Sequence, residues 1–454
     1  MRSIATSILI TTLGLSLTGR AQSPQAGELL TLQEAVSTAL RQTPEHRAAT
    51  LGVDAARAAE RLQKTAWLPA ISFTESATRG NDPVYVFGAR LRQQRFTKDD
   101  FALNQLNTPK PLGSFATRFS GEWLAFDFGN RAYAGRGAAQ QTASAQTAAT
   151  RAGQQIVYRV VAGYRAVMTE EKQFEVARHQ VETAQALLAA SQARVGTGVA
   201  VASDELLAQA NLAARQQEQI AAEGDLAIAW AELERAVGAP ISEDRRRMSE
   251  LHPLRFEPAA LEEAIATALR ARPDRQSLEH ETAAAHAGVQ EARSALAPTL
   301  HAYGDWEADR GSFAGSGGNN WMVGAELRMD LFPAAKRQQL ELARIAEQRT
   351  RVTAQSAAAQ IRLEVTRAWF GQQSAARMVE AAQASLAQTA ESLRILRNRY
   401  NAGLATMNDL LRGEDAERQS QASYWAAVSR NAVAWCELKF AMGTLDAGVA
   451  GDLQ

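Results

Sequence analysis

The chain repeats itself, and this duplication constrains its fold more than any other feature of the sequence. Residues 32–73 align without gaps on residues 261–302 at an offset of 229, and residues 194–238 align on residues 399–443 at an offset of 205. The first register pairs Leu32, Glu34, Arg41, Pro44 and Pro69 with Leu261, Glu263, Arg270, Pro273 and Pro298. The second pairs Gly198, Asp204, Trp230 and Gly238 with Gly403, Asp409, Trp435 and Gly443. Gapless agreement over such lengths is hard to obtain from composition alone, so we predict a fold made of two copies of one unit.

The N-terminus is typical of an exported protein. Arg2 precedes an apolar stretch from Ile4 to Leu17, and small residues follow around Gly19 and Ala21. This order indicates a signal peptide over residues 1–21. The remaining sequence has no run of about 18 apolar residues, so any crossing of a membrane would use β-strands.

Charge and composition argue against two further classes of protein. Lys and Arg number 49 and balance 49 Asp and Glu, and no basic cluster is interleaved with aromatic residues, so no nucleic-acid partner is expected. The six His residues are scattered and no nucleophile motif is present, so we expect no catalytic residues, no metal and no cofactor. The only cysteine, Cys436, is interpreted as a small packing residue of a helix rather than a reactive thiol.

Long helices dominate both predicted copies. In the first copy, residues 22–240, we predict a helix from Thr31 to Ala66 that Pro44 interrupts, a long helix over 131–195, and a helix over 203–238 that ends at Gly238. In the second copy, residues 258–443, the corresponding helices cover about 258–296, 336–400 and 408–443. Residues 241–257 form a linker and residues 444–454 a C-terminal tail. The two shorter helices of each copy together match the long one in length and could stack end to end alongside it.

Alternation with a period of two predicts two strands in each copy. Trp321, Val323 and Leu327 alternate with polar residues, and Met329 and Leu331 continue the pattern. The predicted strands cover about 69–78, 115–126, 298–309 and 320–332. Four strands with one lipid-like face cannot close on themselves, and an open edge in hydrocarbon costs several kcal/mol per unsatisfied backbone group. Other subunits must therefore complete the sheet, although this argument leaves their number open.

Four segments carry a resemblance to a known family. RVGTGVAVASDELL from Arg194 and RYNAGLATMNDLLR from Arg399 resemble the inter-helix turns of the TolC-type outer-membrane efflux proteins, and LAFDFGNR from Leu124 and LFPAAKR from Leu331 resemble their strand-to-helix transitions. The resemblance implies a homotrimer with a twelve-stranded barrel in contact with outer-membrane lipid and a twelve-helix tunnel through the periplasm. It also implies a periplasmic adaptor protein and an inner-membrane transporter as partners.

The two inter-helix turns are the candidate docking site. The resemblance implies that the adaptor binds the exposed helix tips, which gives as docking residues Val195, Gly196, Thr197, Gly198, Tyr400, Asn401, Ala402 and Gly403. The alternative is that Gly198 and Gly403 only supply the positive φ angle that a reversing chain needs. Substituting aspartate for either glycine distinguishes these interpretations.

A gate is the second candidate site that the resemblance implies. Matching by register assigns Tyr400 to a tyrosine that bonds a Thr/Asp pair, here Ser203 and Asp204, although these two residues would equally cap the following helix. Ala405 stands where the best-known members have an arginine that strengthens the latch. Asp409 matches an acidic ring at the narrow entrance, but Arg412 lies one helical turn later and could cancel its charge, and a solvated helix face is the alternative.

The loops and tryptophans at the membrane end support weaker predictions. Residues 79–114 contain an insertion of roughly 23 residues relative to the second copy, which we expect to form a large loop, most simply external, and a candidate constriction of the exit. The Gly-rich segment from Gly311 is expected to be a hairpin loop rather than a phosphate site. Trp67, Trp123, Trp306 and Trp321 are interpreted either as an interfacial belt or as strand packing.

These features together predict the exit duct of a tripartite export system, most simply for small molecules, in the bacterial outer membrane with its helices in the periplasm. The exit duct of a type I protein-secretion system is the alternative. An exported coiled-coil scaffold without a pore would explain the helices alone, but the alternating strands argue against it. Substrate identity cannot be read from the sequence.

Overall fold

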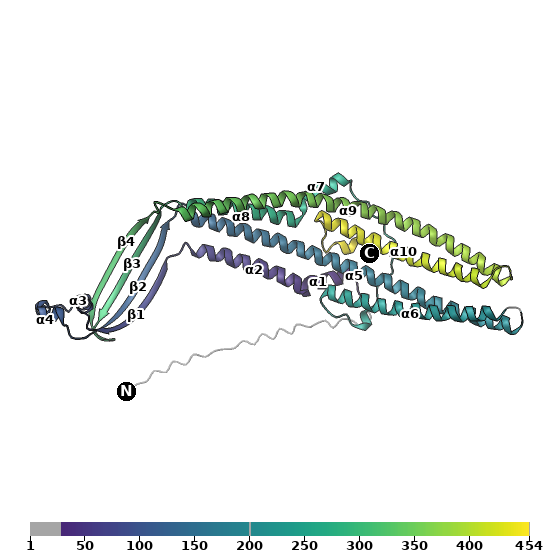
Figure 1. The fold of residues 1–454 in the computed structure, drawn as a ribbon, viewed down its shortest axis with the longest axis horizontal. Helices are drawn as coiled ribbons and strands as arrows, with labels where there is room; N and C mark the ends of the chain where they lie inside the picture. The colour runs from purple at the N-terminus through teal and green to yellow at the C-terminus, as the bar shows by residue number, and fades with distance from the viewer. Residues whose placement is uncertain (1–28, 199–200, 454) are drawn as a thin grey trace, which may run out of the picture.

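The computed structural model describes residues 29–198 and 201–453, and the predicted signal peptide lies outside these ranges. A four-stranded sheet lies at one end of an elongated molecule, and long helices run from it to two turns at the opposite end (Figure 1). The prediction of a mostly helical chain with a few antiparallel strands is confirmed.

Apart from an insertion between the first two strands, the two halves contain the same helices and strands in the same order. The first half contains α1 (Leu32–Gln42), α2 (Pro44–Thr65), β1 (Ala70–Gly80), β2 (Leu112–Phe126), α5 (Asn130–Gly196) and α6 (Ala202–Val237). The second half contains α7 (Leu261–Ala271), α8 (Pro273–Ser294), β3 (Thr299–Arg310), β4 (Gly317–Arg328), α9 (Ala334–Asn401) and α10 (Met407–Met442), and the chain continues to a short α11 (Val449–Asp452). A short 3-10 helix, η2 (Glu243–Arg245), lies between the halves. Paired helices have 11 and 11, 22 and 22, 67 and 68, and 36 and 36 residues.

Proline divides the first helix of each half. Thr31 begins α1 by accepting a hydrogen bond from the Glu34 backbone N–H at 3.2 Å. Thr43 and Arg272 each precede a proline, and both have extended backbone. Thr43 has φ of −64° and ψ of 132°, and Arg272 has φ of −65° and ψ of 122°. The proline ring disfavours helical backbone at the preceding residue, so α1 and α7 end there and α2 and α8 begin at the proline. The expected interruption at Pro44 is thus confirmed.

The shorter helices stack along the long ones. In the first half α1 and α2 follow the sheet-proximal part of α5 and α6 follows its distal part, and α7, α8 and α10 are arranged likewise around α9 (Figure 1). The apolar stripe predicted on α5 is buried in the main core, including Val160, Val161 and Val167 at 0% exposure. Cys436 is buried in the same core, as expected for a packing residue. None of the helices in the described ranges contains a stretch long and apolar enough to span a membrane.

One tertiary hydrogen bond recurs in both halves. The Tyr164 hydroxyl donates to the Leu30 carbonyl at 2.7 Å, and the Trp369 indole N–H donates to the Ala259 carbonyl at 2.9 Å. The donors are related by the offset of 205 and the acceptors by the offset of 229. Each bond ties the segment before the first helix to the middle of the long helix, so the two halves reach the same packing with different side chains.

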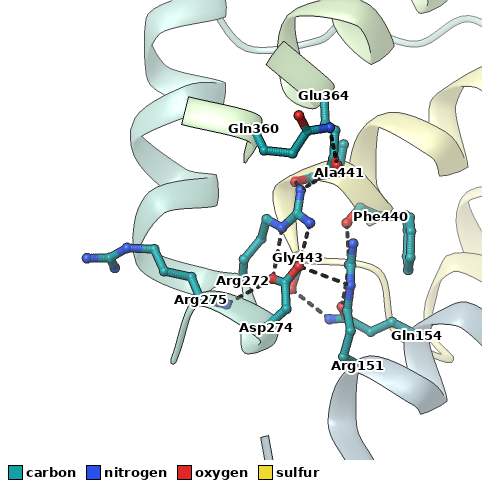
Figure 2. A network of polar contacts seen from close by, with 10 residues as sticks. All are labelled: Arg151, Gln154, Arg272, Asp274, Arg275, Gln360, Glu364, Phe440, Ala441 and Gly443. Carbon is teal, nitrogen blue, oxygen red and sulfur yellow. Dashed lines mark hydrogen bonds and ion pairs between the residues drawn. The ribbon is translucent and has the colours of Figure 1, made fainter. Parts of the chain in front are cut away.

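A buried polar joint forms where the break between α7 and α8 meets the end of α10 (Figure 2). Arg272, which is 4% exposed, bonds Asp274 through Nε at 3.0 Å and Glu364 of α9 through Nη1 at 2.5 Å. Side chains from α5 satisfy the last carbonyls of α10: Arg151 donates to Phe440 O at 2.7 Å, and Gln154 donates to Gly443 O at 2.7 Å. A helix C-terminus leaves such carbonyls without intrahelical partners, so the joint completes α10.

The pKa values of the two acids reflect this joint. Burial by itself would raise the pKa of Asp274 and of Glu364, but hydrogen bonds and the charge of Arg272 outweigh it, and both pKa values are lowered. Burial also lowers the pKa of Arg151 to about 10, with a contribution from the nearby Arg272 charge.

The first half has the same joint with its charges exchanged. Thr43 stands at the position of Arg272, and Glu45 stands at the position of Asp274. Arg159 replaces Glu364 and pairs with Glu45 at 3.5 Å, with their side chains 34% and 53% exposed. The acid after the proline is therefore kept in both halves, while its basic partner moves from the helix break to the long helix.

Arg272→Met is expected to destabilise the protein and to flatten its pH dependence. Removing one member of a buried ionic cluster costs about 3 kcal/mol because the remaining charges lose their partner. Acids whose folded-state pKa is lowered stabilise the fold fully above their ordinary pKa values of 3.8 and 4.5, and this stabilisation is lost as the pH falls below these values and through the lowered folded-state pKa values. Urea unfolding between neutral and acidic pH measures both effects. Arg159→Met, at the more exposed joint, should cost about 1 kcal/mol or less. Equal losses of unfolding free energy in the two variants would contradict a larger contribution from the buried joint.

Two predictions at the sheet end are wrong. The strand predicted over about 320–332 ends at Arg328, whose partner is Thr299. Pro298 has no N–H to continue the ladder, so Met329 and Leu331 lie outside the strand despite their alternation. The segment expected as a large loop between β1 and β2 contains α3 (Pro83–Arg92), a 3-10 helix (Lys98–Phe101) and α4 (Leu103–Asn107). Asp82 caps α3, and its carboxylate accepts the Tyr85 N–H at 2.8 Å.

Candidate functional site: the sheet and the helix tips

The sheet has one apolar face with a row of aromatic side chains. Phe73, Phe119, Trp306 and Trp321 are direct partners across the four strands in the order β1-β2-β3-β4. Their exposures are 61%, 46%, 40% and 74%, and ring centroids lie 5.1 Å apart for Phe73 and Phe119 and 5.9 Å apart for Phe119 and Trp306. A continuous exposed apolar surface of this kind marks a face that water does not cover in the assembled protein.

The opposite face of the same strands is polar. Thr74, Arg118, Glu307 and Asn320 are partners in one row, and Arg118 pairs with Glu307 at 2.6 Å. Further along, the same face contains Ser72, Ser120, His301, Asp305 and Glu326. One face is therefore suited to hydrocarbon and the other to water.

The edges of the sheet are open. Within the described residues, β1 pairs only with β2 and β4 only with β3, so the outer edges of β1 and β4 carry unpaired backbone groups. Side chains on these edge strands are also exposed, with Ile71 at 75% and Val323 at 71%. Such an edge is a template for pairing with another chain.

The two turns predicted as the docking site lie together at the end of the molecule away from the sheet (Figure 1). Gly198 follows α5 with φ of +75°, and Gly403 follows α9 with φ of +74°. Their N–H groups donate to Val195 O and Tyr400 O at 3.0 Å each, which closes both helix ends. Of the predicted docking residues, Gly196, Thr197, Gly198, Asn401, Ala402 and Gly403 are exposed and Val195 is half-buried.

Tyr400 lies inside the molecule, unlike the rest of the predicted docking residues. Its side chain is 8% exposed and belongs to an apolar cluster with Ala208, Leu393 and Leu410. The Arg194 guanidinium lies over its ring, 4.9 Å from the centroid, and joins the tip of α5 to the tip of α9. Burial raises the pKa of Tyr400, an effect that Arg194 opposes and the charge of Asp204 reinforces.

The sequence reasoning missed two residues at the tips. Arg194 begins the repeated segment 194–238, but the repeat does not show its contact with Tyr400. This contact joins two hairpins that are distant in the sequence. Leu404 is 69% exposed directly after Gly403. An apolar residue inside a glycine-containing turn was a readable sign of an exposed contact point.

The acids at the start of α6 and α10 have different environments. Thr406 and Asp409 form a reciprocal cap, in which Asp409 N–H donates to Thr406 Oγ1 at 3.2 Å and Thr406 N–H donates to Asp409 at 3.0 Å. These bonds with Thr406, and the charge of Arg412, lower the pKa of Asp409. At the equivalent of Thr406 the first half has Val201, which is the N-cap of α6, so the alternative that Ser203 and Asp204 cap this helix is wrong. Ser203 is exposed and Asp204 is half-buried in the first turn.

An ionic cluster connects α6 to α10 between the two hairpins. Arg215 contacts Asp415 at 2.6 Å and Glu218 at 2.7 Å, and Arg418 contacts the same two acids at 3.6 Å and 3.7 Å. The Arg215 side chain is 11% exposed. Two of these ion pairs, Arg215–Asp415 and Arg418–Glu218, cross between the helices, so an apolar cluster, a cation over a ring and two ion pairs hold the tips of the two halves together.

Comparisons with known proteins agree with this geometry. The model of the outer membrane efflux protein family matches residues 35–239 and 264–444. Over 430 residues the chain is 25% identical to the alkaline protease secretion protein AprF of Pseudomonas aeruginosa, covering 92% of this chain and 85% of AprF. The fold of this chain is similar to that of the CmeC outer membrane channel of Campylobacter jejuni, with a TM-score of 0.78, 15% identity, and coverage of 100% of this chain and 98% of CmeC. The open-state MtrE outer membrane channel of Neisseria gonorrhoeae gives a TM-score of 0.75, 18% identity, and coverage of 92% and 90%.

The predicted family resemblance is thus confirmed over both halves of the chain. A sheet with one apolar and one polar face, continued by helices of 67 and 68 residues, has the features required of a channel that crosses a membrane and extends far beyond it. The chain belongs to the outer membrane efflux protein family and is an outer-membrane export channel.

Proposed function

We propose that three copies of the chain form the exit duct of a tripartite export system, with twelve strands closed into a barrel and twelve helices continued into a periplasmic tunnel. The observation that supports this best is the pair of open edges on a two-faced sheet. Edge β1 of one copy would pair with edge β4 of the next, which satisfies the backbone and places the aromatic row in lipid. The polar face would line the lumen.

The helices set the reach of the tunnel. An α-helix of 67 residues is about 100 Å long. The tips around Gly198 and Gly403 would therefore lie far from the membrane, where the adaptor of an inner-membrane transporter docks. Their exposed backbone and the exposed Leu404 side chain provide the contact surface.

The cargo we favour is small molecules. The family whose model matches both halves of the chain is that of the outer membrane efflux proteins. Secretion of a protein is the second candidate, because AprF is a protease secretion protein and aligns with 92% of this chain.

Membrane extraction and crosslinking test the proposal. The protein should stay with outer membranes through salt and alkaline washes, dissolve only in detergent, and have the mass of three chains by light scattering. A photo-crosslinker at Leu404 should capture the adaptor encoded with it, whereas one at the exposed Leu62 of α2 should not. Release by alkali, or a monomer in detergent, would exclude the barrel.

The gate of this duct would include Arg194 together with Tyr400 and Asp204. Tyr400→Phe keeps the ring beneath Arg194 but loses the hydroxyl, so it should raise single-channel conductance slightly, and Tyr400→Ala should raise it more because the cation–ring contact also disappears. Planar bilayer recordings measure both. Tyr424→Phe, in the main core far from the tips, is the matched control and should leave conductance unchanged. Unchanged conductance in Tyr400→Ala would exclude this latch.

A further inference from the structure

The insertion between β1 and β2 folds over the polar face of the sheet. A cavity of about 390 Å³ lies between them, lined by α3 residues Val84, Tyr85, Gly88, Ala89 and Arg92 and by sheet residues Ser76, Thr78, Ser114, Ala116, Arg118, Glu307 and Asp309. All of the sheet residues in this lining belong to the polar face, since they share rows in the strand register. They also lie in the half of the sheet farther from the helices (Figure 1).

Hydrogen bonds fasten α3 to several strands. The Tyr85 hydroxyl donates to the Thr78 and Leu112 carbonyls at 2.9 Å and 3.4 Å. Gln93, which is 2% exposed, donates to the Gly113 and Arg310 carbonyls at 3.1 Å and 3.4 Å. These bonds reach the ends of β1, β2 and β3.

A contact with β4 completes the attachment. The Asn320 side-chain amide donates to the Arg92 carbonyl at 3.2 Å, and Arg92 pairs with Glu307 at 3.6 Å. The insertion thus contacts all four strands.

The insertion also has a small core of its own. Asp100 caps the 3-10 helix by bonding Thr97 and forms an ion pair with Arg90. The rings of Phe87, Phe96 and Phe101 meet edge to face, with centroids 4.9 Å and 5.2 Å apart. A segment with internal packing and several anchors keeps one position over the sheet, unlike a free loop.

We propose that residues 81–111 form a fixed constriction inside the outer mouth of the channel. This rests on the proposed function, because the polar face becomes the lumen wall only when copies close the barrel. Three α3 helices would then stand inside the exit, each bonded to its own wall, and they would limit the size of what leaves the duct. The second hairpin has only the short connection of residues 311–316, so it adds no helix of its own to the constriction.

Cysteine labelling on intact cells tests the constriction. In a Cys436→Ala background, Ser114→Cys places a thiol on the polar face beneath α3, where Ser114 is 7% exposed. A bulky membrane-impermeant maleimide should label it slowly in the full chain. When residues 81–111 are replaced by the chain's own connection 311–316, labelling should accelerate at least about tenfold, because access no longer waits for local opening. Rapid labelling in the full chain, or slow labelling in both, would overturn the proposal.

Two additional variants separate this result from other failures. Phe73→Cys, on the apolar face, should resist the aqueous reagent in every variant, and rapid labelling there would mean that the sheet is not in a membrane and that the proposed function itself fails. If the grafted chain does not reach the outer membrane, Tyr85→Phe combined with Gln93→Ala removes the four side-chain hydrogen bonds of these two residues to the strands without deleting the segment. Ser114→Cys should then be labelled several-fold faster than in the anchored chain, and an unchanged rate would overturn the constriction.

Discussion

Gly443→Ala is expected to lower the free energy of unfolding by about 2 to 5 kcal/mol and to reduce the amount of channel in the membrane. Gly443 ends α10 with φ of +75°, where a non-glycine residue is strained by about 1 to 2 kcal/mol. A Cβ atom there would also lie 2.7 Å from the Cα of Arg272, and backbone at that distance cannot move aside cheaply. The joint beside Arg272 would have to open.

The chain supplies its own control for this substitution. Gly403 has nearly the same φ, +74°, but nothing lies within 4 Å of the added Cβ, so Gly403→Ala should cost only the strain, about 1 kcal/mol. Gly238→Ala would place a Cβ 3.0 Å from the Cα of Thr43, so its cost in unfolding free energy should lie between those of the other two variants. Urea unfolding of purified protein measures all three. Equal costs at Gly443 and Gly403 would show that close packing at the joint is unimportant.

Gly198→Asp and Gly403→Asp are expected to abolish export while leaving the channel in the membrane. Among the described residues, nothing lies within 4 Å of a Cβ added at either position, and aspartate tolerates positive φ better than most residues, so folding should be little affected. Each substitution places a charge and a side chain on a tip where the adaptor is proposed to contact exposed backbone. Docking should therefore fail, with at least about a tenfold loss of adaptor binding.

Growth in toxic compounds and adaptor pull-down measure this effect in cells that lack their own channel. Gly198→Asn and Gly403→Asn have the same size without the charge and should retain more export than the aspartate variants. Loss of the channel from the membrane in the aspartate variants would favour the alternative that these glycines serve the turn geometry alone. Normal export with normal protein amounts would exclude docking at the tips.

Most helices and the faces of the strands were predictable because local pattern determines them. Leu32, Pro44 and the apolar stripe of α5 mark where helices start, stop and pack, and alternation around Trp321 identifies a two-faced strand. The end of β4 was not predictable from alternation alone. A strand needs a partner, and Pro298, directly before β3, has no N–H to continue the pairing.

The remaining errors concern contacts between distant segments. The start of α3 has a local signal in Asp82 and Pro83, a cap followed by proline at the first helical position. The bonds that Tyr85 and Gln93 make to carbonyls at the ends of several strands are not revealed by any local pattern. The partner of Tyr400 at the tip is Arg194, on a helix of the other half, rather than the Ser203 side chain. In contrast, Val201 in place of Thr406 was visible in the sequence and would have shown that the two turns are capped differently.

The two ion pairs between α6 and α10, Arg215–Asp415 and Arg418–Glu218, have a consequence for how the duplicated chain can be divided. Arg215 and Glu218 come from the first half, and Asp415 and Arg418 come from the second. The offset of 205 does not align any of these residues with the residue to which it is ion-paired. A ring built from six copies of either half would therefore lack this contact at every junction. In the proposed trimer, fusion of the halves would make the junction within each chain permanent and stabilised by charge, and would leave the junction between neighbouring chains free to evolve separately.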